Sequence, residues 1–350
     1  MKVVVYSIKP FEKEFLIRAN QKKHEITLIS NALSLETVIY AEGKDAIVIS
    51  ANDDASETVI NKLADFGVKY IATRSVGTDH IDIDAAENKN IKLANVPDYS
   101  PQAIAEHAVT LALALNRRLI RAEKNARNFD FRGDDLIGFN FYGKTVGIIG
   151  MGHIGLAAAN IFKGFGCEVL GYDINLGTGH DHVPLVDLNE LLSRSDIISI
   201  HTPLTPANRG MINKSSIAFM KDGVMIINTA RGALIKTKDV LYALDSGKIG
   251  YLGLDVYEFE KGLFFEDHEY DKPQDELLKR LMDHPNVLIT PHQGYLTKEA
   301  LQEIANKTIE NLDLWQQERC VGDACIGNQQ CEQKTVAKKP AELDPMNHLP

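Results

Sequence analysis

Residues 145–173 contain the feature that most restricts how this chain can fold. A short apolar run precedes three glycines, Gly150, Gly152 and Gly155, in the spacing G-x-G-x-x-G. The pattern predicts a strand before the glycines, a helix after them and a second strand that ends at Asp173. Glycines at this spacing allow a tight turn, the approach of backbone to a pyrophosphate, and packing of the helix on the strand. The stretch therefore predicts one half of a doubly wound α/β sheet with a dinucleotide site.

Asp173 indicates which dinucleotide would bind. The start of the predicted helix offers free N–H groups and the positive end of its dipole to phosphates. A carboxylate after the second strand accepts hydrogen bonds from ribose hydroxyls and repels a 2′-phosphate, so the site favours NAD over NADP. A solitary glycine motif is common in structural turns, but the strand, the helix and the acidic residue in this order favour the dinucleotide site.

Composition places the chain among globular proteins of two domains. It has 350 residues, of which 44% are hydrophobic and 25% charged, and a formal net charge of −10. The acidic balance argues against nucleic-acid binding, which needs a basic face. No apolar run reaches the roughly 18 residues of a membrane helix, and the first residues do not resemble a signal peptide. We therefore expect no nucleic-acid or membrane partner and a cytoplasmic location.

Strand and helix patterns alternate along most of the chain, which predicts an α/β fold of two doubly wound parallel-sheet (Rossmann-like) domains separated by a cleft. We expect residues 1–99 to form the substrate domain and residues 100–296 the NAD-binding domain. A long amphipathic helix at 297–317 is expected to return to the first domain, which makes that domain discontinuous.

Two further segments call for an interpretation. The helix expected at 102–118 is apolar nearly all round, which is typical of a buried helix, here between domains or at a subunit interface. Residues 318–350 lose periodicity and are predicted to be a disordered tail. Its cysteines, Cys320, Cys325 and Cys331, lack the spacing of zinc pairs, so we predict free thiols rather than a metal site.

Ligands of open α/β sheets bind at the carboxyl ends of the strands, where Arg231, Asp255, Glu260 and His292 occur. Around them the chain resembles the D-isomer-specific 2-hydroxyacid dehydrogenases and, within that family, the fermentative D-lactate dehydrogenases. The resemblance extends from residue 1 to about 317. It rests on RSVGTDHID (74–82), VPDYSPQAIAEHA (96–108), YGKTVGIIGMGHIG (142–155), NTARGALI (228–235), LDSGKIG (244–250), LDVYEFEKGLFFED (254–267) and TPHQGYLT (290–297).

The resemblance implies a catalytic set of Arg231, Glu260 and His292. Histidine exchanges protons near neutral pH, so His292 would be the acid during reduction and the base during oxidation. Glu260, rather than the nearby Glu258, would hold its other ring nitrogen. Arg231 offers a planar fork that suits a substrate carboxylate.

The resemblance also implies binding residues. Backbone of Val76 and Gly77, with Arg231 and His292, would bind the substrate, and Tyr99 and Tyr295 would line its side-chain end. Other positions match residues that bind the cofactor. These are Gly150, Gly152, His153, Ile154, Gly155, Asp173, Thr202, Pro203, Asn208, Thr229, Ala230, Arg231 and Asp255. We read Asp79, His80, Asp82 and His107 as structural.

These residues predict an NAD-dependent enzyme that reduces pyruvate to D-lactate, without a metal and as a homodimer or homotetramer. Two alternatives remain open. One is a dehydrogenase for a larger 2-keto acid, and the other is a non-catalytic protein that senses NAD, because corepressors share this fold. The acidic segment 50–56 argues against a phosphorylated substrate.

Overall fold

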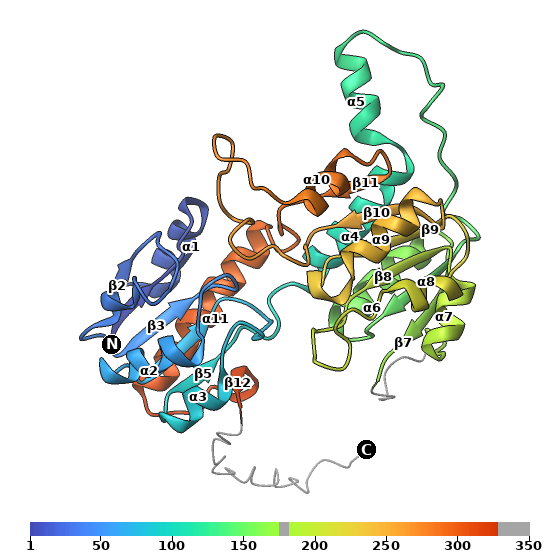
Figure 1. Cartoon of the computed structure of the whole chain (residues 1–350). Coiled ribbons are helices and arrows are strands. Elements are labelled where there is room, and N and C mark those ends of the chain that lie inside the picture. Colours follow the sequence, from blue (N-terminus) through green and yellow to red (C-terminus); the bar gives the residue numbers. More distant parts are fainter. Residues whose placement is uncertain (175–181, 328–350) are drawn as a thin grey trace, which may run out of the picture.

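The computed structural model describes residues 1–174 and 182–327, which form two α/β units side by side (Figure 1). Each unit is built around a six-stranded sheet whose strands are mostly apolar and buried. The predicted fold of two doubly wound sheets is confirmed. None of the helices within the described ranges is long and apolar enough to cross a membrane.

The first sheet has the order β12-β5-β4-β3-β1-β2. Strands β1 to β5 pair in parallel. Alternate side chains of each strand enter the two cores on its faces; Val4 packs in one core, and Val3 and Val5 in the other. Its elements in chain order are β1 (Lys2–Val5), α1 (Pro10–Asn20), β2 (Glu25–Leu28), η1 (Val38–Ala41), β3 (Ala46–Ile49), α2 (Glu57–Asp65), β4 (Tyr70–Thr73), α3 (Ile83–Asn88) and β5 (Lys92–Ala94).

The second sheet is wholly parallel, in the order β11-β10-β9-β8-β6-β7. The chain reverses direction across the sheet between β6 and β8, which places a crevice at the carboxyl ends of these strands. The elements are β6 (Thr145–Ile149), α6 (His153–Gly164), β7 (Glu168–Tyr172), α7 (Leu188–Arg194), β8 (Ile197–Ile200), α8 (Lys214–Phe219), β9 (Val224–Asn228), η2 (Gly232–Leu234), α9 (Thr237–Asp245), β10 (Ile249–Leu254), α10 (Glu276–Asp283) and β11 (Val287–Ile289).

Helix α11 (Lys298–Gln316) returns to the first unit, as its orange-red ribbon among blue elements shows (Figure 1). The hydroxyl of Thr297 caps it by accepting a hydrogen bond from the N–H of Ala300. Its apolar face, which includes Ile309 and Trp315, packs in the same core as Val3 of β1.

The prediction of a disordered tail from residue 318 is wrong for its first ten residues. After η3 (Gly322–Ala324), β12 (Cys325–Ile326) pairs antiparallel with β5 and adds an edge strand to the parallel sheet. Ile326 enters the core, which explains why so short and polar a segment is ordered. Cys325 is outside any disulfide, but Cys320 is disulfide-bonded, so the expectation of free thiols is wrong for Cys320. Cys331 lies outside the described residues.

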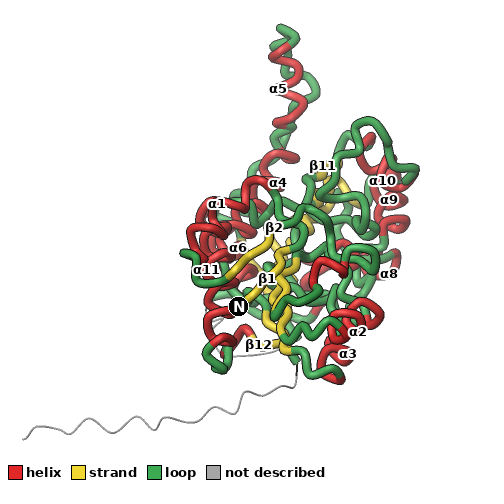
Figure 2. Tube along the Cα trace, turned by 90° about the vertical axis from the view of Figure 1, so that its left-hand side faces the viewer, coloured by secondary structure: helices red, strands yellow, loops and turns green. Residues whose placement is uncertain are grey.

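The apolar helix α4 (Pro101–Asn116) is buried within the second unit, in a core that it shares with α6 and β9. The burial that its apolar pattern predicts is therefore met within this unit. The segment that follows is exposed: α5 (Leu119–Arg127) has no buried residue and projects from the body (Figure 2). We call residues 119–140 the projecting arm. Its apolar side chains are largely exposed, with relative exposures of 85% for Phe129, 79% for Phe131 and 81% for Ile137.

Candidate functional site

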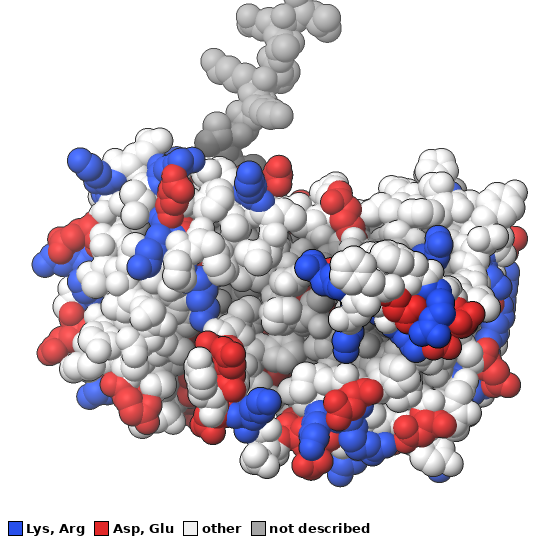
Figure 3. All heavy atoms as spheres, turned by 90° about the horizontal axis from the view of Figure 1, so that it is seen from above, with Lys and Arg blue, Asp and Glu red and all other residues white. Residues whose placement is uncertain are grey.

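A cleft of about 950 Å³ lies between the two units and is lined by residues of both. From above, the surface is hollowed between the two halves, and mostly uncharged atoms are in view there (Figure 3). Most of the predicted site residues line this cleft. They are Val76, Gly77, Tyr99, Ile154, Thr202, Pro203, Thr229, Ala230, Arg231, Asp255, His292 and Tyr295.

The glycine loop between β6 and α6 forms one end of the site. Gly150 has φ +93°, and a Cβ there would lie 2.7 Å from the carbonyl of His201, so only glycine fits this turn. Helix α6 begins at His153, and Gly152 and His153 line a smaller pocket that shares Ile154 with the main cleft. The imidazole of His153 is largely exposed and lies 3.3 Å from Asp98, so its ring is engaged on the surface.

Asp173 follows β7 and lies beside the glycine loop, as predicted. Its Oδ2 accepts a hydrogen bond of 2.7 Å from the backbone N–H of Met151. The carboxylate is therefore held at the mouth of the turn between β6 and α6. This arrangement fits an adenosine ribose next to a pyrophosphate at the helix N-terminus.

Residues after β8 and β9 form the middle of the site. The amide of Asn208 joins the N–H of Thr205 (2.8 Å) to the carbonyl of Pro203 (2.8 Å), so Asn208 shapes the loop without lining the cleft. Thr229 lines the cleft, and its buried Oγ1 has no hydrogen-bond partner within the described chain. Because buried hydroxyls normally have a partner, this oxygen fits a bound molecule.

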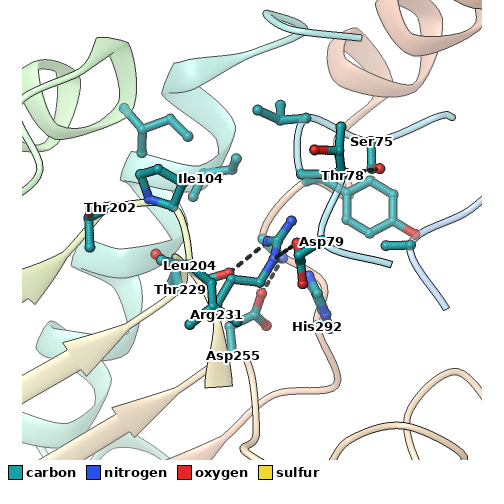
Figure 4. Close-up of a pocket in the computed structure, with 18 of the residues that line it drawn as sticks. Ser75, Thr78, Asp79, Ile104, Thr202, Leu204, Thr229, Arg231, Asp255 and His292 are labelled. Atoms are coloured by element: carbon teal, nitrogen blue, oxygen red, sulfur yellow. Dashed lines mark hydrogen bonds and ion pairs between the residues drawn. The ribbon is translucent and has the colours of Figure 1, made fainter. Parts of the chain in front are cut away.

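Arg231 extends from the end of β9 towards the first unit (Figure 4). Its Nε donates to Oδ1 of Asp79 (2.9 Å), and its Nη1 donates to the carbonyl of Ala230 (2.9 Å). A Cβ on Gly77 would lie 1.4 Å from Nη2 of Arg231, so glycine is required for the guanidinium to reach the 76–79 loop. The loop and the guanidinium together suit a carboxylate.

Asp79 was predicted to be structural, but it lines the cleft and joins the two units. Burial acts to raise the pKa of Asp79, but the adjacent Arg231 guanidinium outweighs burial and holds the pKa below its usual range. Asp82 is structural as predicted, because its carboxylate caps α3.

His292 and Glu260 form a pair at the opposite wall. The Nδ1 atom of His292 lies 3.0 Å from Oε1 of Glu260, whose Oε2 accepts from the N–H of Tyr257 (2.9 Å). Glu258 points elsewhere and accepts from the N–H of Thr237 (2.8 Å). His292 has φ +54°, a strained conformation for a residue with a side chain. With Nδ1 engaged, Nε2 is the nitrogen left to face a substrate.

Asp255 holds the loop that carries His292. Its oxygens accept hydrogen bonds from the N–H groups of Gln293 (2.9 Å) and Gly294 (2.7 Å) and from the hydroxyl of Thr290 (2.6 Å). His107, read as structural, lies 3.2 Å from the same carboxylate. Burial acts to raise the pKa of Asp255, but the hydrogen bonds from His107, Thr290 and the loop outweigh it and lower the pKa. Asp255 therefore positions the strained turn as well as lining the cleft.

Tyr99 and Tyr295 line the cleft, as predicted. Burial raises the pKa of both phenols, that of Tyr295 to about 12, so both are neutral at physiological pH. Sequence reasoning missed Glu12, Arg74 and Phe265, which also line the cleft. Their positions in the sequence do not indicate a binding role, since Glu12 lies on a helix and Phe265 within a long loop.

Comparisons with known proteins agree with this geometry. Residues 109–294 match the family described as D-isomer specific 2-hydroxyacid dehydrogenase, NAD binding domain. A D-lactate dehydrogenase of Escherichia coli (strain K12) is 44% identical over 320 residues, which are 89% of this chain and 96% of the relative. The structure of the pyruvate reductase of Chlamydomonas reinhardtii superposes with a TM-score of 0.86, at 42% identity, and covers 92% of this chain and 98% of its own. A D-lactate dehydrogenase of Lactobacillus jensenii, solved with NAD+, superposes with a TM-score of 0.78 at 35% identity. The match covers 93% of this chain and 100% of that protein's chain.

Proposed function

Because this chain belongs to the D-isomer specific 2-hydroxyacid dehydrogenases, we propose that it is an NAD-dependent D-lactate dehydrogenase that interconverts pyruvate and D-lactate. The observation that carries the proposal is one cleft lined by both Arg231 and His292, with Glu260 hydrogen-bonded to that histidine. A 2-keto acid needs one cation for its carboxylate and one proton donor for its keto oxygen, and the cleft offers both.

Arg231 and the 76–79 loop would bind the substrate carboxylate. The Nη2 atom of Arg231 has no acceptor within the described chain and lies against Gly77, and the backbone N–H groups of Val76 and Gly77 would add neutral donors. Asp79 fixes the guanidinium through Nε, so its remaining edge is aligned before substrate arrives.

His292 would transfer the proton. In the reduction of pyruvate, Nε2 donates a proton to the keto oxygen as it becomes a hydroxyl; in the oxidation of D-lactate, Nε2 takes that proton back. Glu260 orients the ring through its hydrogen bond to Nδ1. Closure of two units over a cleft would exclude water from this transfer.

NADH, when bound, supplies the hydride that reduces the keto carbon. The residues that would hold the cofactor are the glycine loop with the α6 N-terminus, Asp173 at the ribose, and Thr202, Thr229 and Asp255 nearer the reacting centre. We also propose that residues 1–99 with 297–317 are the substrate domain and 100–296 the NAD-binding domain, in the cytoplasm, where the pool of NADH is available.

Initial-rate oxidation of NADH with 2-keto acids from pyruvate to 2-ketoisocaproate, followed by chiral analysis, tests the proposal. We expect a strong preference for pyruvate and D-lactate as product. Activity only on the larger acids would keep the chemistry and replace the substrate. Tight NADH binding without turnover of any acid would contradict the proposed dehydrogenase activity and favour a protein that senses NAD.

We propose further that the chain is a homo-oligomer, a dimer or a tetramer, which assembles through the projecting arm at 119–140. Exposed Phe129, Phe131 and Ile137 on one arm are typical of a surface that is buried by a partner. Sedimentation velocity should show a dimer or tetramer for the unmodified protein and a smaller species when Phe131 and Ile137 are replaced by Ser. Tyr270→Ser, also exposed but outside the arm, is the control.

A further inference from the structure

Phe265 lies against the ring of His292, and nothing in the chemistry described above uses it. The two ring centroids are 5.3 Å apart, with the planes at 41°. Phe265 lines the cleft together with His292 and Tyr295. Glu260 therefore bonds Nδ1 of the imidazole while Phe265 packs against the ring in a tilted arrangement.

The turn that carries Phe265 is fixed at its base. It starts at Glu260, whose carbonyl accepts hydrogen bonds from the N–H groups of Leu263 (2.9 Å) and Phe264 (3.0 Å). Both of these side chains pack on the core of the second unit. Phe265 itself has φ +68°, a conformation that costs energy for a residue other than glycine and persists only where its surroundings hold it.

Part of what holds it comes from the other unit. The ammonium group of Lys9, at the start of α1, donates a hydrogen bond of 2.9 Å to the carbonyl oxygen of Phe265. Lys9 is itself fixed, because its backbone N–H donates to Oε2 of Glu12 (2.9 Å), and Oε1 of Glu12 pairs with Arg74. A chain of polar contacts thus runs from the first sheet across the cleft to the turn that covers His292.

We propose that Phe265 is a specificity-determining and positioning residue for 2-keto acid reduction, and that Lys9 latches it over His292 when the cleft is closed. The proposal rests on the proposed function above. The phenyl ring occupies space in the cleft beside the imidazole that must reach the keto oxygen, so it favours the methyl group of pyruvate over a bulky side chain. It also restricts rotation of the His292 ring and keeps water from one face.

Phe265→Ala tests the specificity role. It removes the ring but keeps the carbonyl that Lys9 contacts. We expect the ratio of kcat/KM for pyruvate to kcat/KM for 2-ketoisocaproate to fall about tenfold, within the range that one altered hydrophobic contact gives. Phe259→Ala is the matched control, since Phe259 is half-exposed, packs on Tyr257 and does not line the cleft. An unchanged ratio in Phe265→Ala would overturn the specificity role.

Lys9→Met tests the latch. We expect kcat/KM for pyruvate to fall about fivefold to tenfold through KM, as for loss of one charge-assisted hydrogen bond, with unchanged affinity for NADH. Lys9→Arg should restore most of the loss, and Lys13→Met, an equal charge change at an exposed site on α1, should have no effect. In Phe265→Ala, adding Lys9→Met should cause little further loss of kcat/KM for pyruvate, because the latch then has no ring to hold. Equal effects of Lys9→Met and Lys13→Met would refute the latch.

Failure of this inference is distinguishable from failure of the proposed function. Lack of turnover by the unmodified protein contradicts the proposed function alone. Calorimetry measures the dissociation constants of pyruvate and 2-ketoisocaproate from the protein–NAD+ complex, in which no hydride is available. The ratio of these two constants reports the preference between the acids without turnover. If Phe265→Ala leaves that binding ratio unchanged, the inference fails whether or not the protein is an enzyme.

Discussion

The carboxylate of Asp79 accepts a hydrogen bond of 2.9 Å from Nε of Arg231, 152 positions away in the chain. Asp79 follows β4 of the first unit and Arg231 follows β9 of the second, so this bond joins the two walls of the cleft (Figure 4). The bond engages Nε of Arg231 and leaves the Nη2 edge of the guanidinium for the carboxylate of a substrate. The orientation of Arg231 therefore depends on the placement of the first unit.

Asp79→Asn should weaken substrate binding more than cofactor binding. The variant keeps the shape of the side chain but loses the charge that aligns Arg231, at a cost of about 1.5–3 kcal/mol for a hydrogen bond between charged groups. We expect kcat/KM for pyruvate to fall about 10- to 100-fold, while the dissociation constant of NADH stays the same.

The matched control is Asp84→Asn, an exposed acidic residue in the first turn of α3. It changes the net charge equally and is not among the residues lining the cleft. Equal kcat/KM values for Asp79→Asn and the unmodified protein would show that Asp79 does not position Arg231.

Glu260→Gln should lower kcat for pyruvate reduction more than it changes the affinity for NADH. The amide keeps the shape of the side chain, but it replaces a charge-assisted hydrogen bond to Nδ1 of His292 with a neutral one. We expect kcat to fall about tenfold, the effect of roughly 1.4 kcal/mol, because the ring is held less firmly for proton transfer. Glu258→Gln, whose carboxylate contacts Thr237 instead, should leave kcat unchanged. Equal losses of kcat in both variants would argue against a specific role of Glu260.

Much of the fold could be predicted because it follows from local patterns. The predicted alternation of strands and helices is present in both sheets, and the side chains of Ser100 and Thr297 cap the two helices expected at 102–118 and 297–317. The strand ends also pointed to Arg231 and His292, because ligands of parallel sheets bind there. Glu260 could be separated from Glu258 only through the family resemblance.

Other contacts could not be read from the chain. The pairs Lys9–Phe265 and Asp79–Arg231 join residues more than 150 positions apart, and they depend on how the two units face each other. β12 is ordered by pairing with β5 rather than by its own propensity. The apolar pattern of α4 correctly indicated burial, but the pattern alone does not say that the partner is the same unit's sheet.

Asp173→Ser should relax the preference for NADH over NADPH. The carboxylate repels a 2′-phosphate, and its hydrogen bond from Met151 holds it beside the ribose position. Removing the charge should raise the ratio of kcat/KM for NADPH to that for NADH about tenfold, the effect of roughly 1.4 kcal/mol. Asp187→Ala, which removes a helix cap away from the cleft, controls for loss of stability. An unchanged ratio would place the ribose elsewhere.

Two partly buried histidines should make the fold less stable as the solution becomes acidic. Burial lowers the pKa of both His80 and His201 to about 4, compared with about 6.5 in an unfolded chain. Between these values the unfolded state binds more protons, so the free energy of unfolding rises with pH in this window, by up to about 1 kcal/mol per pH unit for each histidine. Their contribution is complete above pH 6.5 and is lost as the pH falls towards 4. Urea unfolding between pH 4.5 and 7 (about the range of that window) should give a shallower pH dependence for His201→Gln than for the unmodified protein. The exposed His153→Gln should keep the original slope; a slope that His201→Gln leaves unchanged would assign the acid sensitivity to other groups.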